Sequence, residues 1–274
     1  MLTAVAFVPS PPAFVPQLMG RAAHELDGLR AAADTALGAL VDALLAPAGG
    51  AARADGAGRP STGPAPQLLV VGPGAPSEHV AAGPVGFGEF GLEVDLPALP
   101  GGPQARSGSL PTPILVGRYL AARVTGRTAA VDGLWTAARW VTTDAASGAA
   151  LGAELAASLV PTGLLLLADG AACHGPKAPR AEDSRAAGYE EAVNDALATG
   201  DPAALATLDP HLGAELSATG PELWPLLSAA TDGADWSGEL LHSDAPYGVG
   251  WSVAVWRRAP AGGPVGASSV AQGT

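Results

Sequence analysis

Cysteine is almost absent from this chain. Cys173 is the single cysteine among 274 residues, so no internal disulfide can form. A small secreted scaffold held together by disulfides is therefore excluded. A single thiol is typical of proteins kept in a reducing compartment, and we expect a cytoplasmic location.

Long apolar runs are also missing, although 48% of the residues are hydrophobic. The longest runs, such as 164–168, fall far short of the roughly 20 residues that a membrane-spanning helix needs. The N-terminal segment 1–12 has no basic region typical of a signal peptide. The charged fraction of 15% is too small for an intrinsically disordered chain. We therefore expect a globular protein that has no membrane partner.

Basic residues are scarce, and Lys177 is the only lysine among the 14 basic residues. With 26 acidic residues, the formal net charge is −12. Nucleic-acid binding relies on clustered basic side chains that displace counterions from phosphates. This charge balance argues against a nucleic-acid partner.

Apolar runs and periodicities predict strands alternating with helices. Strands are predicted at residues 2–8, 67–71, 92–96, 164–167, 239–242 and 249–256. Helices are predicted over residues 17–45, from Pro113 onward, and over 145–159, 189–197, 209–218 and 222–230. This order indicates one α/β domain over residues 1–258, in which sites follow the carboxyl ends of strands. Residues 46–66 are predicted to be a flexible insertion, and residues 259–274 a disordered tail.

The segment 86–91 matches G-x-G-x-x-G, the pattern of dinucleotide-binding loops. In those loops the glycines lie between a strand and a helix, so that the helix N-terminus meets the pyrophosphate. Here a strand is predicted to follow at residues 92–96. We therefore interpret the match as a chance result of the high glycine content.

His174 is the strongest candidate for acid–base chemistry, because it lies in a loop directly after the most apolar predicted strand. An imidazole titrates near neutral pH and suits proton transfer. The alternative is a loop histidine whose nitrogens bind backbone carbonyls. Its neighbour Cys173 is either a nucleophile or a buried structural thiol. His79, beside Glu78 in a glycine-rich segment, is either a metal ligand or an exposed loop residue.

A second group of polar residues lies near the C-terminus and comprises Glu239, His242, Asp244 and Tyr247. Side chains alternate along a strand, so Leu240 and His242 should share one face and Glu239 and Leu241 the other. Residues 247–250 are either part of a binding site or only a hairpin turn.

Several of these segments together resemble a known family. They are the strand end Val8-Pro9-Ser10-Pro11-Pro12, the strand end Val71-Gly72-Pro73-Gly74, the loop 169–174 and the segment 245–250. Their order is similar to that of the class III extradiol ring-cleavage dioxygenases. More narrowly, it resembles the protocatechuate 4,5-dioxygenase β-subunit (LigB-like) family, to which Memo-like proteins are related. The resemblance covers most of residues 2–257 through short motifs, and implies a three-layer α/β/α sandwich with a mixed central sheet.

The resemblance also implies a site. Family members hold non-heme Fe(II) through two histidines and a carboxylate, and a further histidine acts as acid and base. The first histidine position is Ser10 here and the second is Gly74, whereas the acid–base position is His174. The carboxylate position corresponds to either Glu239 or Asp244. Without both histidines, the usual iron cage is lost.

Three hypotheses follow from this comparison. First, the chain is a divergent, non-catalytic member that uses no cofactor and binds a small molecule in the old cleft, with candidate binding residues Ser10, Gly74, Asp169, Cys173 and Tyr247. Second, it remains an enzyme, either an oxidoreductase that cleaves a catechol ring with Fe(II) held by a rearranged set drawn from His79, His174, His242, Glu239 and Asp244, or one with metal-free acid–base chemistry at His174. Third, it has a protein-interaction role, as in Memo-like relatives. The family also implies either a homodimer or pairing with a small α subunit. Nothing in the spacing supports a Ser10–His174–Asp169 hydrolase triad.

Overall fold

The structure is a computed structural model that describes residues 1–46, 64–91, 94–105 and 107–259. The predicted insertion at 46–66 and the predicted tail at 259–274 lie almost entirely outside these residues.

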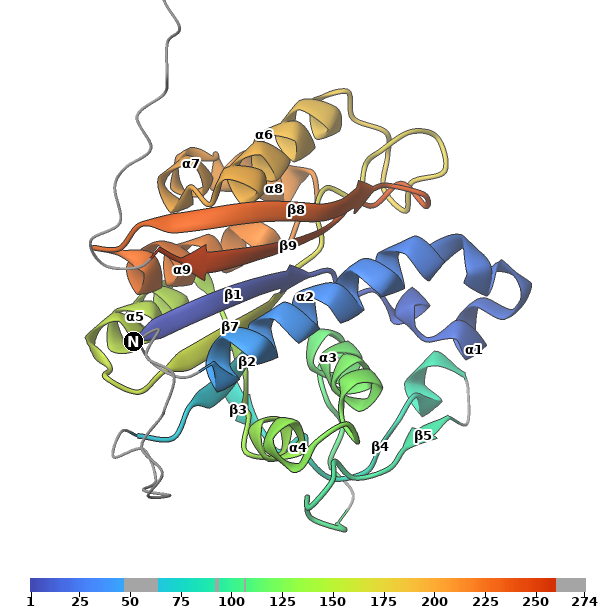
Figure 1. The fold of residues 1–274 in the computed structure, drawn as a ribbon. Coiled ribbons are helices and arrows are strands. Elements are labelled where there is room, and N and C mark those ends of the chain that lie inside the picture. The colour runs from blue at the N-terminus through green and yellow to red at the C-terminus, as the bar shows by residue number, and fades with distance from the viewer. Residues whose placement is uncertain (47–63, 92–93, 106, 260–274) are drawn as a thin grey trace, which may run out of the picture.

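A seven-stranded mixed sheet runs through the described part of the chain, with strand order β3-β6-β2-β7-β1-β9-β8 (Figure 1). The four inner strands β6, β2, β7 and β1 are parallel, whereas β3, β9 and β8 run antiparallel to their neighbours. The strands are β1 (Leu2–Val8), β2 (Gln67–Pro73), β3 (Ser77–His79), β6 (Arg139–Thr143), β7 (Thr162–Leu167), β8 (Trp236–Asp244) and β9 (Trp251–Arg258). A separate two-stranded ribbon pairs β4 (Val85–Gly86) with β5 (Asp95–Leu96).

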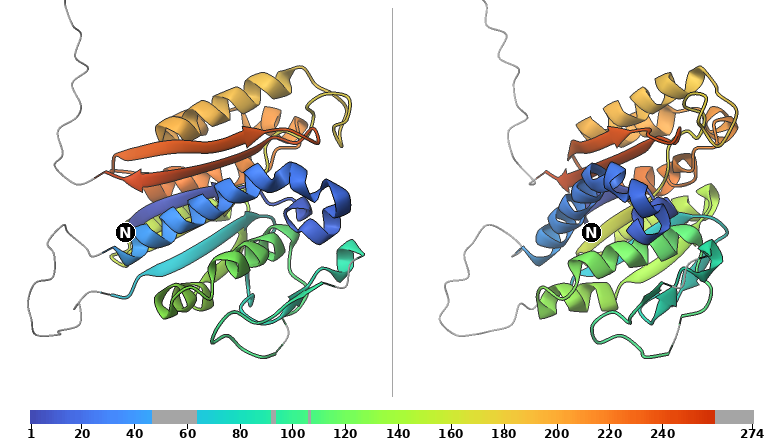
Figure 2. Two further views of the ribbon diagram at one scale, coloured as in Figure 1. Left: turned by 45° about the vertical axis from the view of Figure 1, so that its right-hand side comes forward. Right: turned by 90° about the vertical axis from the view of Figure 1, so that its right-hand side faces the viewer.

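Helices cover both faces of the sheet, which confirms the predicted three-layer α/β/α sandwich (Figure 2). One face carries α2 (Asp27–Leu45), α3 (Thr112–Val124) and α4 (Ala129–Thr136). The other carries α5 (Ala145–Ala157), α6 (Arg185–Thr199), α7 (Pro202–Thr207), α8 (Pro210–Glu215) and α9 (Trp224–Thr231). We refer to these as the α2 face and the α6 face.

Strand β1 shows why the inner strands have continuous apolar sequences. Its residues Ala4, Ala6 and Val8 point into the core on the α2 face, whereas Val5 and Phe7 point into the core on the α6 face. Because both sides of the strand are covered by helices, its sequence does not alternate between apolar and polar residues.

The long helix predicted over residues 17–45 is interrupted in the structure. A short helix α1 (Pro16–Met19) is followed by a 3-10 segment, Gly20–Leu26, before α2 begins at Asp27. Gly20 has φ +54° and ψ −121°, which no right-handed helix can include. The apolar spacing continues across this break, so periodicity alone concealed it.

Strands β3, β4 and β6 and helices α4 and α7 were not predicted from the sequence. In β6, Trp140 and three β-branched residues (Val141, Thr142 and Thr143) have high strand propensity, but the apolar run is short. Only residues 95–96 of the predicted strand 92–96 form a strand, and residues 92–93 lie outside the description. The glycine pattern at 86–91 leads from β4 into a 3-10 turn, Gly88–Phe90, so the context of a dinucleotide loop is absent there.

Candidate functional site

Ser10 and Asp169 meet at the carboxyl edge of the sheet. Ser10 follows β1 and Asp169 follows β7, and these parallel strands are direct neighbours. The backbone N–H of Ser10 donates to Oδ1 of Asp169 at 3.0 Å, and the Ser10 hydroxyl lies 3.5 Å from Oδ2. The backbone N–H of Asp169 donates to the hydroxyl of Thr219 at 2.8 Å, which holds the backbone of Asp169 in place.

The Asp169 carboxyl binds its proton unusually tightly. Burial raises the pKa of Asp169 to about 6, and the hydrogen bonds from Ser10 offset only part of this rise. The negative charge of Glu190 raises the pKa of Asp169 further. The site therefore contains two carboxyl groups, and the charge of Glu190 disfavours the ionisation of Asp169.

Glu190 lies on α6 and connects three segments of the chain. Its Oε2 accepts a hydrogen bond from the backbone N–H of Ala171 at 3.1 Å, and its Oε1 accepts one from the Ser252 hydroxyl at 3.4 Å. Its Oε2 also lies 3.7 Å from Nε2 of His174. Glu190 is 8% exposed, and burial raises the pKa of its carboxyl group.

The Glu190 carboxylate occupies space that is free only because two neighbouring residues are glycines. A β-carbon at Gly170 or at Gly250 would lie 2.2 Å from Oε2 of Glu190. The two glycines are themselves joined, because the N–H of Gly170 donates to the carbonyl of Gly250 at 2.8 Å. The loop after β7 and the turn before β9 thus enclose one carboxylate.

The loop after β7 also positions His174. Its backbone N–H donates to the carbonyl of Gly248 at 3.0 Å, and its side chain is 17% exposed. The Nε2 atom is buried and has no hydrogen-bond partner. The only acidic atom described within 4 Å of it is Oε2 of Glu190. His174 therefore has a ring nitrogen available for proton exchange with that carboxylate.

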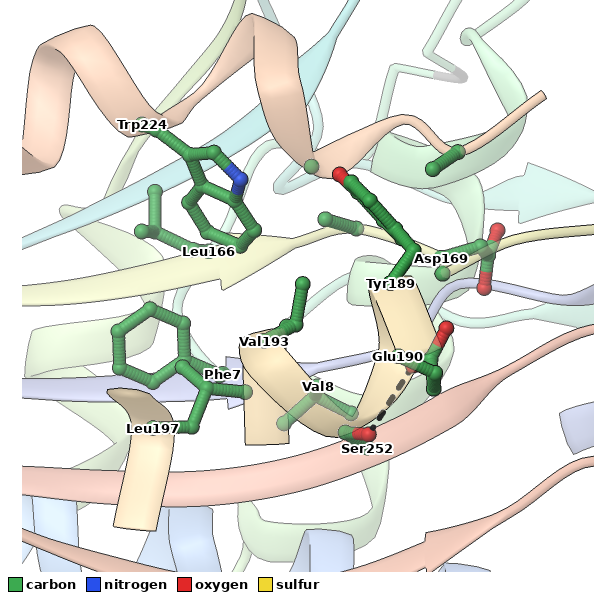
Figure 3. A pocket seen from close by; sticks show the side chains of 14 residues that line it. Phe7, Val8, Leu166, Asp169, Tyr189, Glu190, Val193, Leu197, Trp224 and Ser252 are labelled. Atoms are coloured by element: carbon green, nitrogen blue, oxygen red, sulfur yellow. Dashed lines mark hydrogen bonds between the residues drawn. The ribbon is translucent and has the colours of Figure 1, made fainter. Parts of the chain in front are cut away.

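A small cavity lies beside these groups, between α6 and the sheet (Figure 3). Its volume is about 30 Å³. Since a water molecule needs roughly 10–15 Å³ by this measure, the cavity holds about two waters and no aromatic ring. It is lined by Phe7, Val8, Leu166, Ala168, Asp169, Gly170, Tyr189, Glu190, Val193, Leu197, Ala218, Gly220, Trp224 and Ser252.

Of the residues predicted from the sequence, Ser10 is hydrogen-bonded to Asp169 and His174 lies beside Glu190, but only Asp169 lines the cavity. Cys173, although adjacent to His174, is buried in the core on the α6 face and donates to the carbonyl of Leu216 at 3.4 Å. Gly74 follows β2, on the far side of β7 from Ser10, with φ +142°. The two positions that the resemblance assigns to iron ligands therefore lie on either side of the Asp169 strand.

His79 and Tyr247 have partners of their own. His79 lies on the edge strand β3, where its Nε2 is 2.9 Å from the Thr142 hydroxyl, and burial lowers the pKa of its imidazole. The Tyr247 hydroxyl donates to Oε2 of Glu25 at 2.6 Å. Neither side chain lines the cavity.

The polar residues of β8 lie away from the cavity, and a β-bulge changes the predicted faces. The strand register shifts between Leu240 and His242, so Leu240 packs on the α6 face whereas Leu241 and His242 both turn to the α2 face. The prediction that Leu240 and His242 share a face was therefore wrong. Within the strand Glu239 pairs with Arg257 at 3.3 Å, and Asp244 at its end is exposed.

These placements do not suit an iron ion. Within residues 1–46, 64–91, 94–105 and 107–259, no three side chains of the types His, Cys, Asp and Glu are arranged as metal ligands. Ser10 and Gly74 supply no imidazole, and Asp169 instead accepts hydrogen bonds from Ser10. The donor set present at this edge therefore does not match the two histidines and one carboxylate of the resembling family.

Glu190 was the main omission of the sequence analysis. It lies in phase with the apolar residues of α6, four residues after Ala186, three before Val193 and seven before Leu197. An ionisable residue within the buried stripe of a helix is rare and needs a partner. The place of Glu190 in this apolar stripe was therefore a signal in the sequence that it is buried at a site. Ser252, Tyr189 and Trp224, which also line the cavity, show no comparable sequence signal.

A scan of the chain against models of known protein families found no match, and a search of curated proteins found none either. Among the helices described, none is long and apolar enough to cross a membrane.

Proposed function

We propose that this chain is a divergent relative of the class III extradiol dioxygenases that binds a small organic molecule at the carboxyl edge of β1 and β7, without iron-dependent ring cleavage. The observation that carries the proposal is the hydrogen-bonded pair Ser10 and Asp169, near a second pair in which Nε2 of His174 lies 3.7 Å from Oε2 of Glu190. The first pair stands where the resemblance expects a metal ligand, and the second keeps the acid–base residue beside a carboxylate.

The charges of the site indicate what it binds. Asp169 and Glu190 both lie at the cavity, and no lysine or arginine lines it. An anionic ligand, such as a carboxylate or a catecholate dianion, would meet these groups without compensation. A neutral hydrogen-bond donor or a cation is favoured over an anion, and His174 lies beside this cavity, 3.7 Å from Oε2 of Glu190. The reducing cytoplasm remains the expected location for such a protein.

The rearranged metal site of the second hypothesis lacks this support. It requires three of His79, His174, His242, Glu239 and Asp244 to converge, yet His79 and His242 lie at opposite edges of the sheet, and the described residues contain no such group of three. No particular observation favours the interaction role over ligand binding.

Ligand binding is tested by a fragment screen on ¹⁵N-labelled protein treated with a chelator. We expect neutral polar fragments to shift the amide signals of Ala171 and His174 in a saturable way. His174→Ala should weaken this binding at least several-fold, because one polar contact is lost. His211→Ala is the matched control, since His211 is exposed on α8. Unchanged affinity in His174→Ala, or shifts that need added iron, would contradict the proposal.

A further inference from the structure

An open groove lies on the α6 face, between α7 and α9. Its volume is about 530 Å³, which is within the range of pockets that hold a drug-sized molecule or a few residues of peptide. Asp232 is the one charged residue among those that line it, and Trp224 lines both this groove and the small cavity beside Asp169. The lining of this α7–α9 groove comprises Leu205, Ala206, Leu208, Pro210, Pro221, Trp224, Pro225, Ser228, Ala229 and Asp232.

The described part of the chain ends beside this groove. After β9, the N–H of Ala259 donates to the carbonyl of Asp235 at 2.9 Å, and Asp235 follows closely on Asp232. The indole N–H of Trp236 also donates to the carbonyl of Thr231, the last residue of α9, at 3.2 Å. Figure 1 likewise shows α9 next to the end of β9. The tail, residues 260–274, therefore begins at the Asp232 end of the groove.

A short part of the tail can reach the other end of the groove. Helix α9 has 8 residues, so it is about 12 Å long at a rise of about 1.5 Å per residue. Residues 260–265 span up to about 20 Å when they are extended. This length covers the step from Ala259 to α9 and the whole of the helix. Val265 can therefore lie against Trp224, at the first turn of α9.

The sequence of the tail suits this groove. Residues 260–274 contain no Asp, Glu, Lys, Arg or His, although the chain has a net charge of −12. Their side chains therefore lose no charge hydration on docking and are not repelled by Asp232. The other long stretch outside the description, residues 47–63, contains charged side chains and follows α2, on the opposite face of the sheet.

Pro264 and Val265 give the tail two adjacent apolar side chains. Proline restricts the backbone, which reduces the conformational entropy that is lost when a segment is ordered. Grooves that contain aromatic side chains are common docking sites for extended segments that contain proline. Among residues 260–274, the part around Pro264 therefore fits the α7–α9 groove best.

We infer that residues 263–266 dock in the α7–α9 groove of the same chain, with Val265 against the ring of Trp224. The docked segment covers apolar surface on α7 and α9. Because Trp224 also lines the cavity beside Asp169, the segment supports one wall of that cavity from outside. The inference goes beyond the proposed function and does not depend on ligand binding.

The test attaches a nitroxide spin label to the tail of the 274-residue chain through Ser268→Cys. Cys173 is 3% exposed and should stay unlabelled. A docked tail should broaden the backbone amide signals of Leu208 and Trp224 at least threefold more than that of Leu2. Leu2 reports on a free tail, because its carbonyl lies 3.5 Å from the guanidinium of Arg258, next to the start of the tail.

Two variants of the labelled chain test which residue docks. Val265→Asp replaces an apolar contact by a charge that Asp232 repels, so the ratio of docked to free tail should fall by roughly tenfold or more. Val270→Asp is the matched control, because it makes the same change outside residues 263–266. The broadening at Trp224 should persist in Val270→Asp and disappear in Val265→Asp.

Three outcomes would overturn the inference. The first is broadening at Leu208 and Trp224 no larger than that at Leu2, and the second is broadening that survives in Val265→Asp. The third is broadening at Trp224 of ¹⁵N-labelled protein without a spin label when it is mixed with spin-labelled ¹⁴N protein, because the tail of a second copy would then occupy the groove. Fragment binding at His174 is measured separately, so the proposed function stands or fails by its own test.

Discussion

The carboxylate of Glu190 occupies the space that a side chain at Gly250 would need, because a β-carbon there would lie 2.2 Å from Oε2 of Glu190. The same carboxylate accepts the N–H of Ala171 and lies beside His174. The arrangement of the site therefore requires a residue without a side chain at position 250, in the turn before β9.

This relationship predicts a coupled effect in a double-mutant cycle. Gly250→Ala should lower the free energy of unfolding by about 2 kcal/mol, since the carboxylate must move into less favourable contacts. In a Glu190→Ala background the same change should cost at least 1 kcal/mol less. Urea unfolding of the four proteins measures the difference.

The control for this cycle is Gly188→Ala on the exposed side of α6. A β-carbon at Gly188 meets nothing within 4 Å, so alanine should stabilise the helix by up to about 1 kcal/mol. Equal costs of Gly250→Ala in both backgrounds would show that the clash with Glu190 is not the cause.

Asp169 should make stability depend on pH. Its pKa of about 6 in the folded protein lies above the ordinary value of 3.8, so between these values the folded state holds more protons than the unfolded state. The contribution of this group to stability is therefore full below pH 4, falls as the pH rises and is lost above pH 6. The loss is at most about 3 kcal/mol, from about two pKa units.

Asp169→Asn removes this titration and keeps an oxygen that can accept the N–H of Ser10. Relative to wild type, the variant should therefore gain stability from pH 4 to about pH 6 and level off above it, measured by urea unfolding at half-unit steps. The exposed Asp195→Asn on α6 should show no such trend. A stability difference between Asp169→Asn and wild type that is constant across this range would refute the shifted pKa.

Arg118 should be sensitive to replacement even by lysine. This guanidinium, on α3, is 1% exposed, and its Nε donates to the carbonyl of Ala81 at 2.9 Å while another nitrogen donates to the carbonyl of Pro97. Burial lowers the pKa of Arg118 to about 10. A lysine has one ammonium group and cannot reproduce this planar arrangement.

We expect Arg118→Lys to lower the free energy of unfolding by about 2 kcal/mol, because one buried carbonyl loses its donor. Arg127→Lys, at an exposed position after α3, should change it by less than about 0.5 kcal/mol. Equal effects of the two changes in urea unfolding would show that the Arg118 contacts contribute little.

Strands buried on both faces were predictable, because β1 and β7 have continuous apolar runs that end at proline or at Asp169-Gly170. The polar and β-branched strand β6 was not, since its position between β2 and β3 follows from tertiary pairing. The break at Gly20 depends on a backbone conformation that only the glycine itself signals. The bulge at Leu241 likewise leaves no mark in the alternation of residue types.

The site residues that follow strand ends could be predicted from the sequence. The residue that reaches the site through helix packing could not. Ser10, Asp169 and His174 all follow strands, so chain order placed them at one edge. Glu190 reaches the same edge from α6, and its partners Ala171 and Ser252 come from two other segments. Such a convergence depends on how α6 packs on the sheet, which sequence spacing does not reveal.

The central claim, a ligand site without iron-dependent ring cleavage, is tested most directly by oxygen uptake. Purified protein is incubated anaerobically with Fe(II) and ascorbate, and is then mixed with a panel of catechols in air-saturated buffer. The account predicts oxygen consumption no faster than in controls without protein, since Ser10 and Gly74 provide no imidazole. Stoichiometric retention of iron together with catechol-dependent oxygen uptake would contradict it.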